Sequence, residues 1–223
     1  KGIFPFSNPT AKEIYVYRGE DTNLEFGVTD DSGKIKDLRI VQGSANISNS
    51  GAARGQVRDE YGLTMTSETN ENGIVATTAK PAITRITGRV SDTINGNRNY
   101  TGNLITRYLV AEDLDGAIFS YPDNNRNLEQ EGAFRLVVRE QTQKYDVQLQ
   151  GAESNKIAVA DVNNLSTEDF EKIKSNIKIV YNTADDARLR DKEETKPGKL
   201  VENASQYIQS ITNSGNNIVV TYK

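Results

Sequence analysis

The sequence predicts a mainly β protein, with a β-sandwich over residues 1–150 followed by a small α+β domain over residues 151–223. In the first part, short runs of β-branched and aromatic residues alternate with turns of Asn, Asp, Ser and Gly, which is typical of a sandwich. Near residue 150 this pattern gives way to a helix signal and then to short strands. A chain of 223 residues is long enough to bury a core in each part.

Seven segments of the first domain have the composition of strands. In chain order they are residues 13–19, 22–31, 35–43, 62–69, 82–90, 104–113 and 133–149. Turn sequences separate several of them, including "DDSGK" and "DLDGA". Gly33 and Gly116 can take the positive φ that such turns often require.

Three polar loops in this domain are long: residues 42–62, 91–103 and 115–132. Polar loops of this length inside a compact β domain are usually functional or disordered. The second and third of these loops flank the strand predicted over 104–113, which makes that strand the candidate for a functional site.

The second domain contains a helix signal at "NNLSTEDFEKIK". Ser166 is a good N-cap, and Leu165 and Phe170 occupy the positions of a hydrophobic staple. The segment "NIKIVY" (176–181) is expected to leave the helix as a strand, and the last residues to form a hairpin around Ser214 and the following glycine.

The composition excludes several classes of site. The chain has no Cys, no His and no Trp. Disulfides, thiol nucleophiles, Cys/His zinc sites and a Ser-His-Asp triad are therefore impossible. A net charge of −4 argues against a nucleic-acid partner, and no apolar run approaches the roughly 18 residues of a membrane span. Composition leaves a carboxylate site or a Ser-Lys pair open. No nucleophile-base pair is recognisable in the sequence, however, and we expect no cofactor and no enzymatic activity.

Arg107 lies in the middle of the strand predicted over 104–113. Two faces alternate there: Leu104, Thr106, Tyr108 and Val110 on one, and Ile105, Arg107 and Leu109 on the other. An isolated charge is costly in a core, so we expect Arg107 to point outward, with its two apolar neighbours beside it at the surface. In the alternative, Arg107 pairs with an acid on a neighbouring strand or covers apolar surface with its stem.

The residues around Arg107 resemble a known family. "ITRY" (105–108) is similar to the sialic-acid motif in the Siglec-like binding regions of streptococcal serine-rich repeat adhesins. "TRYLVAEDLDG" and "REQTQKY" resemble the last two strands of that domain, and the α+β segment that follows resembles the family's Unique domain. The resemblance covers nearly the whole chain.

The resemblance implies a V-set immunoglobulin-like sandwich that binds terminal sialic acid of host O-glycans. Arg107 would hold the sialic-acid carboxylate, because a guanidinium fork matches its two oxygens. Thr106 and Tyr108 would add hydrogen bonds, partly through backbone groups. Some relatives have Tyr where this chain has Ile105, so that position would contribute only its backbone.

The three long loops would match the family's CD, EF and FG loops, which contact the remaining sugars. From polarity and position alone, Tyr61, Asn97, Tyr100 and Asp123 are further candidates for ligand contacts. The two acids of "DEY" (59–61) are interpreted as solvated loop charge. The Asp-rich segments at 29–33 and 112–116 are interpreted as turns rather than calcium sites.

The resemblance also implies partners and a location. The partners would be sialylated O-glycans on host glycoproteins such as platelet glycoprotein Ib alpha or salivary mucin. The parent protein would be anchored in the cell wall at the bacterial surface, without membrane insertion by this fragment, which would be monomeric. An alternative function is a ligand-free structural stalk module of a Gram-positive surface protein, because sandwich domains also serve as spacers.

Overall fold

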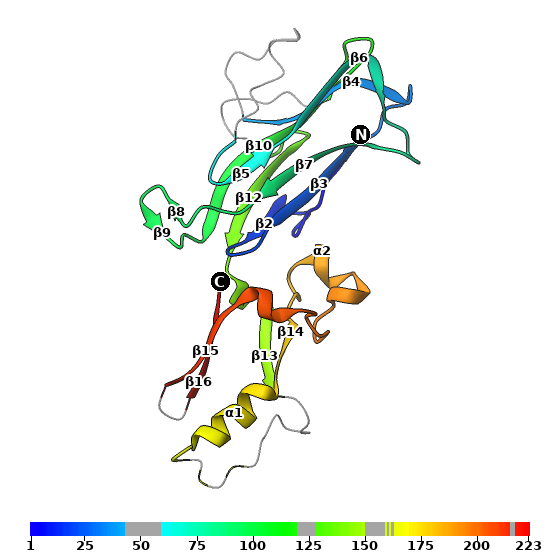
Figure 1. Ribbon diagram of the computed structural model, residues 1–223. Helices are drawn as coiled ribbons and strands as arrows, with labels where there is room; N and C mark the ends of the chain where they lie inside the picture. Colours follow the sequence, from blue (N-terminus) through cyan, green and yellow to red (C-terminus); the bar gives the residue numbers. More distant parts are fainter. Residues whose placement is uncertain (43–58, 120–127, 150–158, 160, 162, 215–216) are drawn as a thin grey trace. The chain divides into compact units, whose positions relative to one another are not determined.

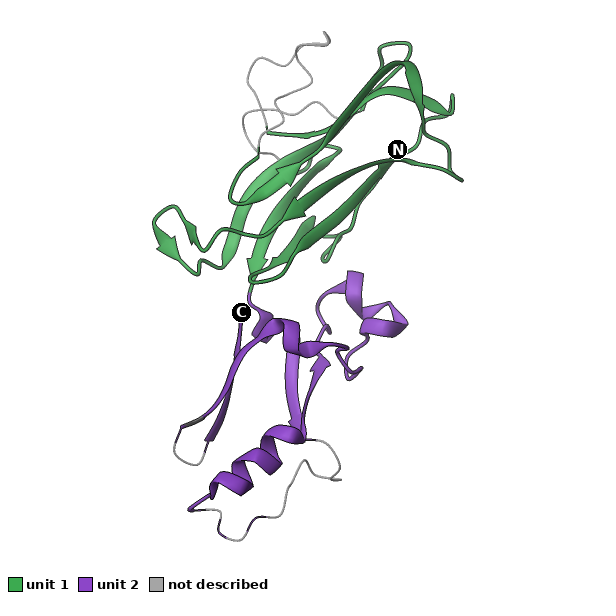
Figure 2. Cartoon of the chain, in the orientation of Figure 1, with its two compact units in different colours: residues 1–139 green, residues 140–223 purple. Residues whose placement is uncertain are grey.

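A computed structural model describes residues 1–42, 59–119, 128–149, 159, 161, 163–214 and 217–223. The chain forms two compact units, Lys1–Arg139 and Glu140–Lys223, which Figure 2 distinguishes by colour. Each unit has its own sheets and its own core, so the two are described separately.

Unit 1 is a sandwich of two sheets (Figure 1). The first sheet has the order β1 (Gly2–Ile3), β3 (Thr22–Val28), β7 (Ala82–Gly88), β5 (Leu63–Met65). The second has the order β2 (Glu13–Tyr17), β12 (Ala133–Arg139), β10 (Gly102–Asp113), β4 (Lys34–Val41), β6 (Ser67–Val75), and β11 (Ile118–Phe119) pairs with β10. The predicted β-sandwich class is confirmed.

The second sheet combines one parallel pair with antiparallel neighbours. β2 runs parallel to β12, with Ile14 opposite Leu136, while β10 is antiparallel to both β12 and β4. This order places β10 in the centre of the sheet, as expected for the central strand of an immunoglobulin-like sandwich. A central strand is fixed on both edges, so the residues of β10 are well positioned for a site.

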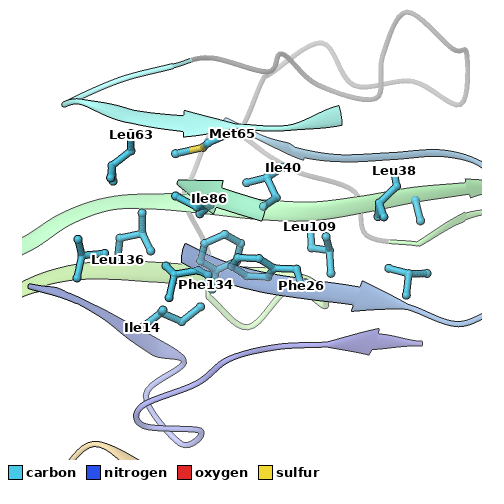
Figure 3. Close-up of a cluster of buried hydrophobic side chains, with 14 of the residues drawn as sticks. Ile14, Phe26, Leu38, Ile40, Leu63, Met65, Ile86, Leu109, Phe134 and Leu136 are labelled. Carbon is cyan, nitrogen blue, oxygen red and sulfur yellow. The ribbon is translucent and has the colours of Figure 1, made fainter. Parts of the chain in front are cut away.

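The core of unit 1 lies between the two sheets. Phe26 of β3 and Phe134 of β12 pack against each other with ring centroids 4.8 Å apart (Figure 3). The ring of Phe4 lies against both. Leu109 of β10 and Ile86 of β7 are also fully buried in this cluster. Both sheets therefore contribute side chains to one continuous apolar layer.

Strand β10 is covered on both faces. Leu109 belongs to the core between the sheets, while Tyr108 and Val110 form a second small cluster on the opposite face. Ile118 and Leu128 pack against that second cluster. The expectation that Leu109 lies at the surface was wrong, because the segments that follow β10 cover its other face and leave both faces apolar.

Unit 2 is built from two strand pairs and short helices. The pairs are β13 (Tyr145–Leu149) with β14 (Ile177–Tyr181), and β15 (Ile208–Ser214) with β16 (Asn217–Tyr222). The helical segments are η2 (Gln141–Gln143), α1 (Thr167–Ser175), α2 (Ala187–Arg190), η3 (Glu193–Thr195) and η4 (Ala204–Tyr207). The strand predicted over 133–149 is thus two strands, and the second pairs within unit 2.

Local signals in unit 2 are confirmed. The Ser166 hydroxyl accepts a hydrogen bond from the Asp169 amide at 3.1 Å, and the Asp169 carboxylate accepts one from the Ser166 amide in return. This reciprocal cap begins α1 at Thr167. The strand expected at 176–181 is β14, and the expected terminal hairpin is β15 with β16.

None of the helices in the described ranges has both the length and the apolar character needed to cross a membrane.

We predict that Phe134→Ala lowers the free energy of unfolding of unit 1 by about 3–5 kcal/mol, because it opens a cavity between the two sheets. Urea unfolding, followed by hydrogen exchange of β10 amides, measures this loss. Val75→Ala, at a position that is 42% exposed on β6, is the control and should change the free energy by less than about 0.5 kcal/mol. Equal effects of the two substitutions would contradict the proposed core.

In unit 2, burial raises the pKa of Tyr222 above its ordinary value of 10.0, and the nearby Asp146 carboxylate adds to the shift. The folded state holds this proton more tightly than the unfolded state. The free energy of unfolding is therefore insensitive to this ionisation below about pH 10, and it falls as the pH rises from there through the folded-state pKa. The buried hydroxyl has no hydrogen-bond partner among the described residues.

We therefore predict that Tyr222→Phe stabilises unit 2 by about 1 kcal/mol at neutral pH, because it removes an unsatisfied buried hydroxyl. The variant should also lose less stability than the wild type above about pH 10. Thermal unfolding across the alkaline range tests both expectations. Parallel pH profiles for the two proteins would show that this phenol does not contribute.

Candidate functional site

The segment Thr106–Tyr108 lies where two long loops join the sheet. β4 ends at Val41 and β12 begins at Ala133, and both of these residues pair with Tyr108 of β10 (Figure 1). The Leu109 amide donates to the Gly132 carbonyl at 2.9 Å, which fixes the end of the loop before β12. The loop after β4 and the loop before β12 therefore both meet the sheet beside this segment.

Arg107 is buried, with 6% of its surface exposed. Its Nη2 donates to Oε2 of Glu60 at 2.5 Å, and its Nη1 donates to the Thr106 carbonyl at 2.9 Å. The expectation of an outward-pointing guanidinium open to solvent was wrong. A buried cation needs a counter-charge, and the acid comes from the loop between β4 and β5.

Glu60 is held by a tight turn. Its amide donates to the Leu63 carbonyl at 3.0 Å, and the Leu63 amide donates back to the Glu60 carbonyl at 2.9 Å. Between them, Tyr61 and Gly62 have φ values of 56° and 83°, the left-handed pair of a two-residue hairpin turn. A Cβ at position 62 would lie 2.1 Å from the Arg89 carbonyl oxygen, so the close approach requires glycine.

This turn is tied to the start of the 91–103 loop. The Ser91 amide donates to the Tyr61 carbonyl at 2.8 Å. The buried Arg18, at the end of β2, donates in turn to the carbonyls of Ser91 (3.2 Å), Asp92 (3.1 Å) and Tyr100 (3.2 Å). One guanidinium thus fixes both ends of the loop and, through Ser91, the turn that positions Glu60.

Within that loop the chain forms a small hairpin of β8 (Thr93–Ile94) and β9 (Asn97–Arg98). Asn95 and Gly96 have φ values of 50° and 79° and make its turn. In Figure 1 the hairpin extends beyond the ends of the two sheets. The loop expected over 91–103 therefore has a secondary structure of its own.

The end of the third loop is held by Lys12. Its Nζ donates to the carbonyls of Leu128 at 2.7 Å and Gln130 at 2.8 Å. Burial lowers the pKa of Lys12, and the charge of Glu131 partly offsets this effect. Hydrogen bonds to the two carbonyls compensate for the loss of hydration that the partly buried Lys12 ammonium suffers.

The predicted site residues fall into different environments. Thr106 is half-buried on β10, Ile105 packs against the main core, and Tyr108 is fully buried in the second cluster. Asn97 lies exposed on β9, and Tyr61 forms the turn after Glu60.

The Tyr100 hydroxyl donates to the Asn103 carbonyl, and its ring packs against the core. Asp123 lies outside the described residues. The structure brings Thr106 and Arg107 together with Glu60, and it does not offer the Tyr108 ring to solvent.

Three residues that shape the candidate site were missed from the sequence: Glu60, Arg18 and Lys12. Glu60 was interpreted as solvated loop charge. The glycine two positions later is a turn signal, however, and a tight turn at this point fixes the position of Glu60. Arg18 and Lys12 are isolated basic residues whose carbonyl partners lie more than 70 residues away, so no local signal marks them.

The acidic turns hold internal hydrogen bonds. Asp30 accepts from the Ser32 amide, and Asp113 accepts from the amides of Asp115 and Ala117. Within the part of the chain that the structure describes, no group of three or more His, Cys, Asp or Glu is arranged to hold a metal ion. These carboxylates therefore stabilise the turns that contain them.

Comparisons with known proteins agree with this architecture. A family model described as the GspA/SrpA SigLec-like domain matches residues 5–144. A crystal structure of the SrpA adhesin from Streptococcus sanguinis, solved as an arginine-to-glutamate mutant, superposes with a TM-score of 0.52 at 21% identity, covering 94% of this chain and 84% of that one.

A second solved structure, the GspB Siglec domain, matches with a TM-score of 0.35 at 21% identity, covering 99% of this chain and 91% of that one. A search of curated proteins finds no match.

We predict that Arg18→Met loosens the 91–103 loop, because three backbone carbonyls lose a charged donor. The expected loss is about 2 kcal/mol of unfolding free energy. Hydrogen exchange of the Asn99 amide, which donates to Asp92 at 2.8 Å, should accelerate. Arg98→Met, on the exposed strand β9, is the control. Unchanged exchange in the Arg18 variant would show that the loop is fixed by other contacts.

Proposed function

The chain belongs to the GspA/SrpA SigLec-like domain family, and from that premise we propose that it binds terminal sialic acid of host O-glycans through Arg107. The family consists of adhesin domains, and the chain is therefore an adhesin-type binding module. The proposed ligand is more specific than this family role: an acidic sugar held on strand β10.

The observation that supports the proposal most strongly is the environment of Arg107. Arg107 directly precedes Tyr108, where two loops join the sheet, and its Nη2 already holds a carboxylate oxygen, that of Glu60. Charge-assisted hydrogen bonds of this kind are about twice as strong as neutral ones, and the low exposure of Arg107 strengthens them further. The site is thus chemically suited to a carboxylate, the group that distinguishes sialic acid from neutral sugars.

The strand itself offers further contacts. The described ladder between β10 and β4 begins at Tyr108, so it does not include the backbone of residues 105–107. The backbone of Ile105 pairs with Leu136 of β12, on the opposite edge of β10, so the expected backbone contact at Ile105 is not proposed. We infer that Thr106, a half-buried residue, contributes backbone groups on the β4 edge together with its hydroxyl. Tyr108 has a buried ring and a backbone that pairs with Val41 of β4, so it positions the neighbouring Arg107 and is not assigned a ligand contact. Loop residues, including Asn97, Tyr100, Tyr61 and Asp123, are proposed to contact the sugars that follow.

A site of this kind gives modest affinity. One charged contact contributes about 1.5–3 kcal/mol, and an exposed glycan site typically reaches roughly millimolar to micromolar Kd. Firm attachment would follow from many copies acting together on one surface. We propose that the parent protein is anchored in the bacterial cell wall and that its partners are sialylated host glycoproteins, such as platelet glycoprotein Ib alpha or salivary mucin.

We predict that Arg107→Lys weakens binding to sialoglycans at least about tenfold, because an ammonium keeps the charge and the Glu60 partner but cannot present the planar fork. A glycan array, followed by calorimetry on the best ligand, measures the change. Arg85→Lys is the matched control, since Arg85 pairs with Glu25 at 2.7 Å on the exposed face of the other sheet.

Full retention of binding in the Arg107 variant would place the site elsewhere. A wild-type protein that binds no sialoglycan on a broad array would instead favour a ligand-free stalk module. These two outcomes are distinct, because the first concerns the residue and the second concerns the function.

A further inference from the structure

The acid that neutralises Arg107 lies where a ligand carboxylate would bind. Glu60 Oε2 accepts from Arg107 Nη2, and the Thr106 carbonyl accepts from Nη1, so both terminal nitrogens are engaged within the protein. We propose that Glu60 is an intramolecular competitor, whose carboxylate occupies the guanidinium in the free protein and is displaced by the carboxylate of an acidic sugar. This inference rests on the proposed function of Arg107.

The geometry of the turn indicates that the side chain of Glu60, and not its backbone, would move during this exchange. The amide and the carbonyl of Glu60 both form hydrogen bonds with Leu63, across the left-handed pair Tyr61 and Gly62. The Tyr61 carbonyl is held in turn by the Ser91 amide. The backbone is therefore rigid at this point, and exchange has to occur by rotation of the Glu60 side chain alone.

The exposure of the two partners supports such an exchange. The side chain of Arg107 is 7% exposed, whereas that of Glu60 is 22% exposed. The carboxylate thus lies at the solvent side of the pair, and it can rotate into water and recover its hydration. The guanidinium stays in place, held by its bond to the Thr106 carbonyl.

Electrostatics make the two carboxylates mutually exclusive. A ligand carboxylate that engages the fork needs Nη2, and two anions at one nitrogen repel each other strongly in a partly desolvated place. Binding therefore exchanges one carboxylate for another. A neutral hydroxyl would leave the buried guanidinium without a counter-charge if it displaced Glu60. The competitor thus lowers affinity for every ligand of the fork and favours ligands that bring a negative charge.

Glu60→Gln is the decisive variant, because it keeps the shape of the side chain and removes the competing charge. Calorimetry would use α2-3- and α2-6-sialyllactosamine, with unsialylated lactosamine as the ligand control. We expect the better sialylated ligand to bind about tenfold tighter, which corresponds to roughly 1.4 kcal/mol, and lactosamine to show no gain.

The matched protein control is Glu25→Gln. It makes the same chemical change at an exposed pair on the first sheet, and it should leave both affinities unchanged. Equal or weaker sialoglycan binding by the Glu60 variant would overturn the inference while leaving Arg107 as the anchor. Loss of wild-type binding to both sialylated probes and to a broad sialoglycan array would instead overturn the proposed function.

If the Glu60 variant folds poorly, a second measurement tests whether a ligand carboxylate displaces Glu60 from Arg107. A crystal structure of the wild-type protein with the tighter sialyllactosamine should show the Glu60 carboxylate rotated away from Arg107 Nη2 and replaced by the sugar carboxylate. A bound sugar carboxylate with the Glu60 contact intact would exclude the exchange.

Discussion

The structure of the site depends on one electrostatic requirement: a guanidinium buried in a sandwich must have a counter-charge close by. Arg107 lies on the central strand of its sheet with only 6% exposure, and Glu60 provides the charge. Glu60 reaches it only because a two-residue turn, with glycine at position 62, directs the chain back toward β10. The ion pair therefore fixes the end of the loop between β4 and β5 against the strand that carries the motif.

A common device holds two of the three loops at their bases. Arg18 donates to carbonyls at both ends of the 91–103 loop, and Lys12 donates to carbonyls near the end of the 115–132 loop. A long cationic side chain can reach several backbone oxygens at once and places few demands on the side chains around them. Contacts to backbone oxygens survive changes of loop sequence, so loops of different composition can be held on the same sandwich.

The fold was predictable from the sequence because its signals are local: alternation along the strands, glycines at the turns, and the Ser166 cap of α1. The burial of each face of β10 was not predictable, because the alternation of residues gives two apolar faces and does not indicate which segment of the chain covers the outer one. Tyr108 and Val110 are buried by Ile118 and Leu128, which follow later in the chain. The partner of Arg107 was missed for the same reason, since Glu60 lies 47 residues away and only the tertiary structure brings it near.

Burial of β10 on both faces also constrains the ligand contacts that we propose for this strand. The aromatic ring of the motif, that of Tyr108, is part of a cluster, so a sugar bound as proposed would meet backbone groups, a threonine and a guanidinium rather than a stacking platform. Such groups distinguish ligands by charge and hydrogen-bonding pattern, which suits the acidic sugar of the proposal. In the proposed site, discrimination among the sugars beyond it would then fall to the loops, because the anchor and the loops depend on different parts of the chain.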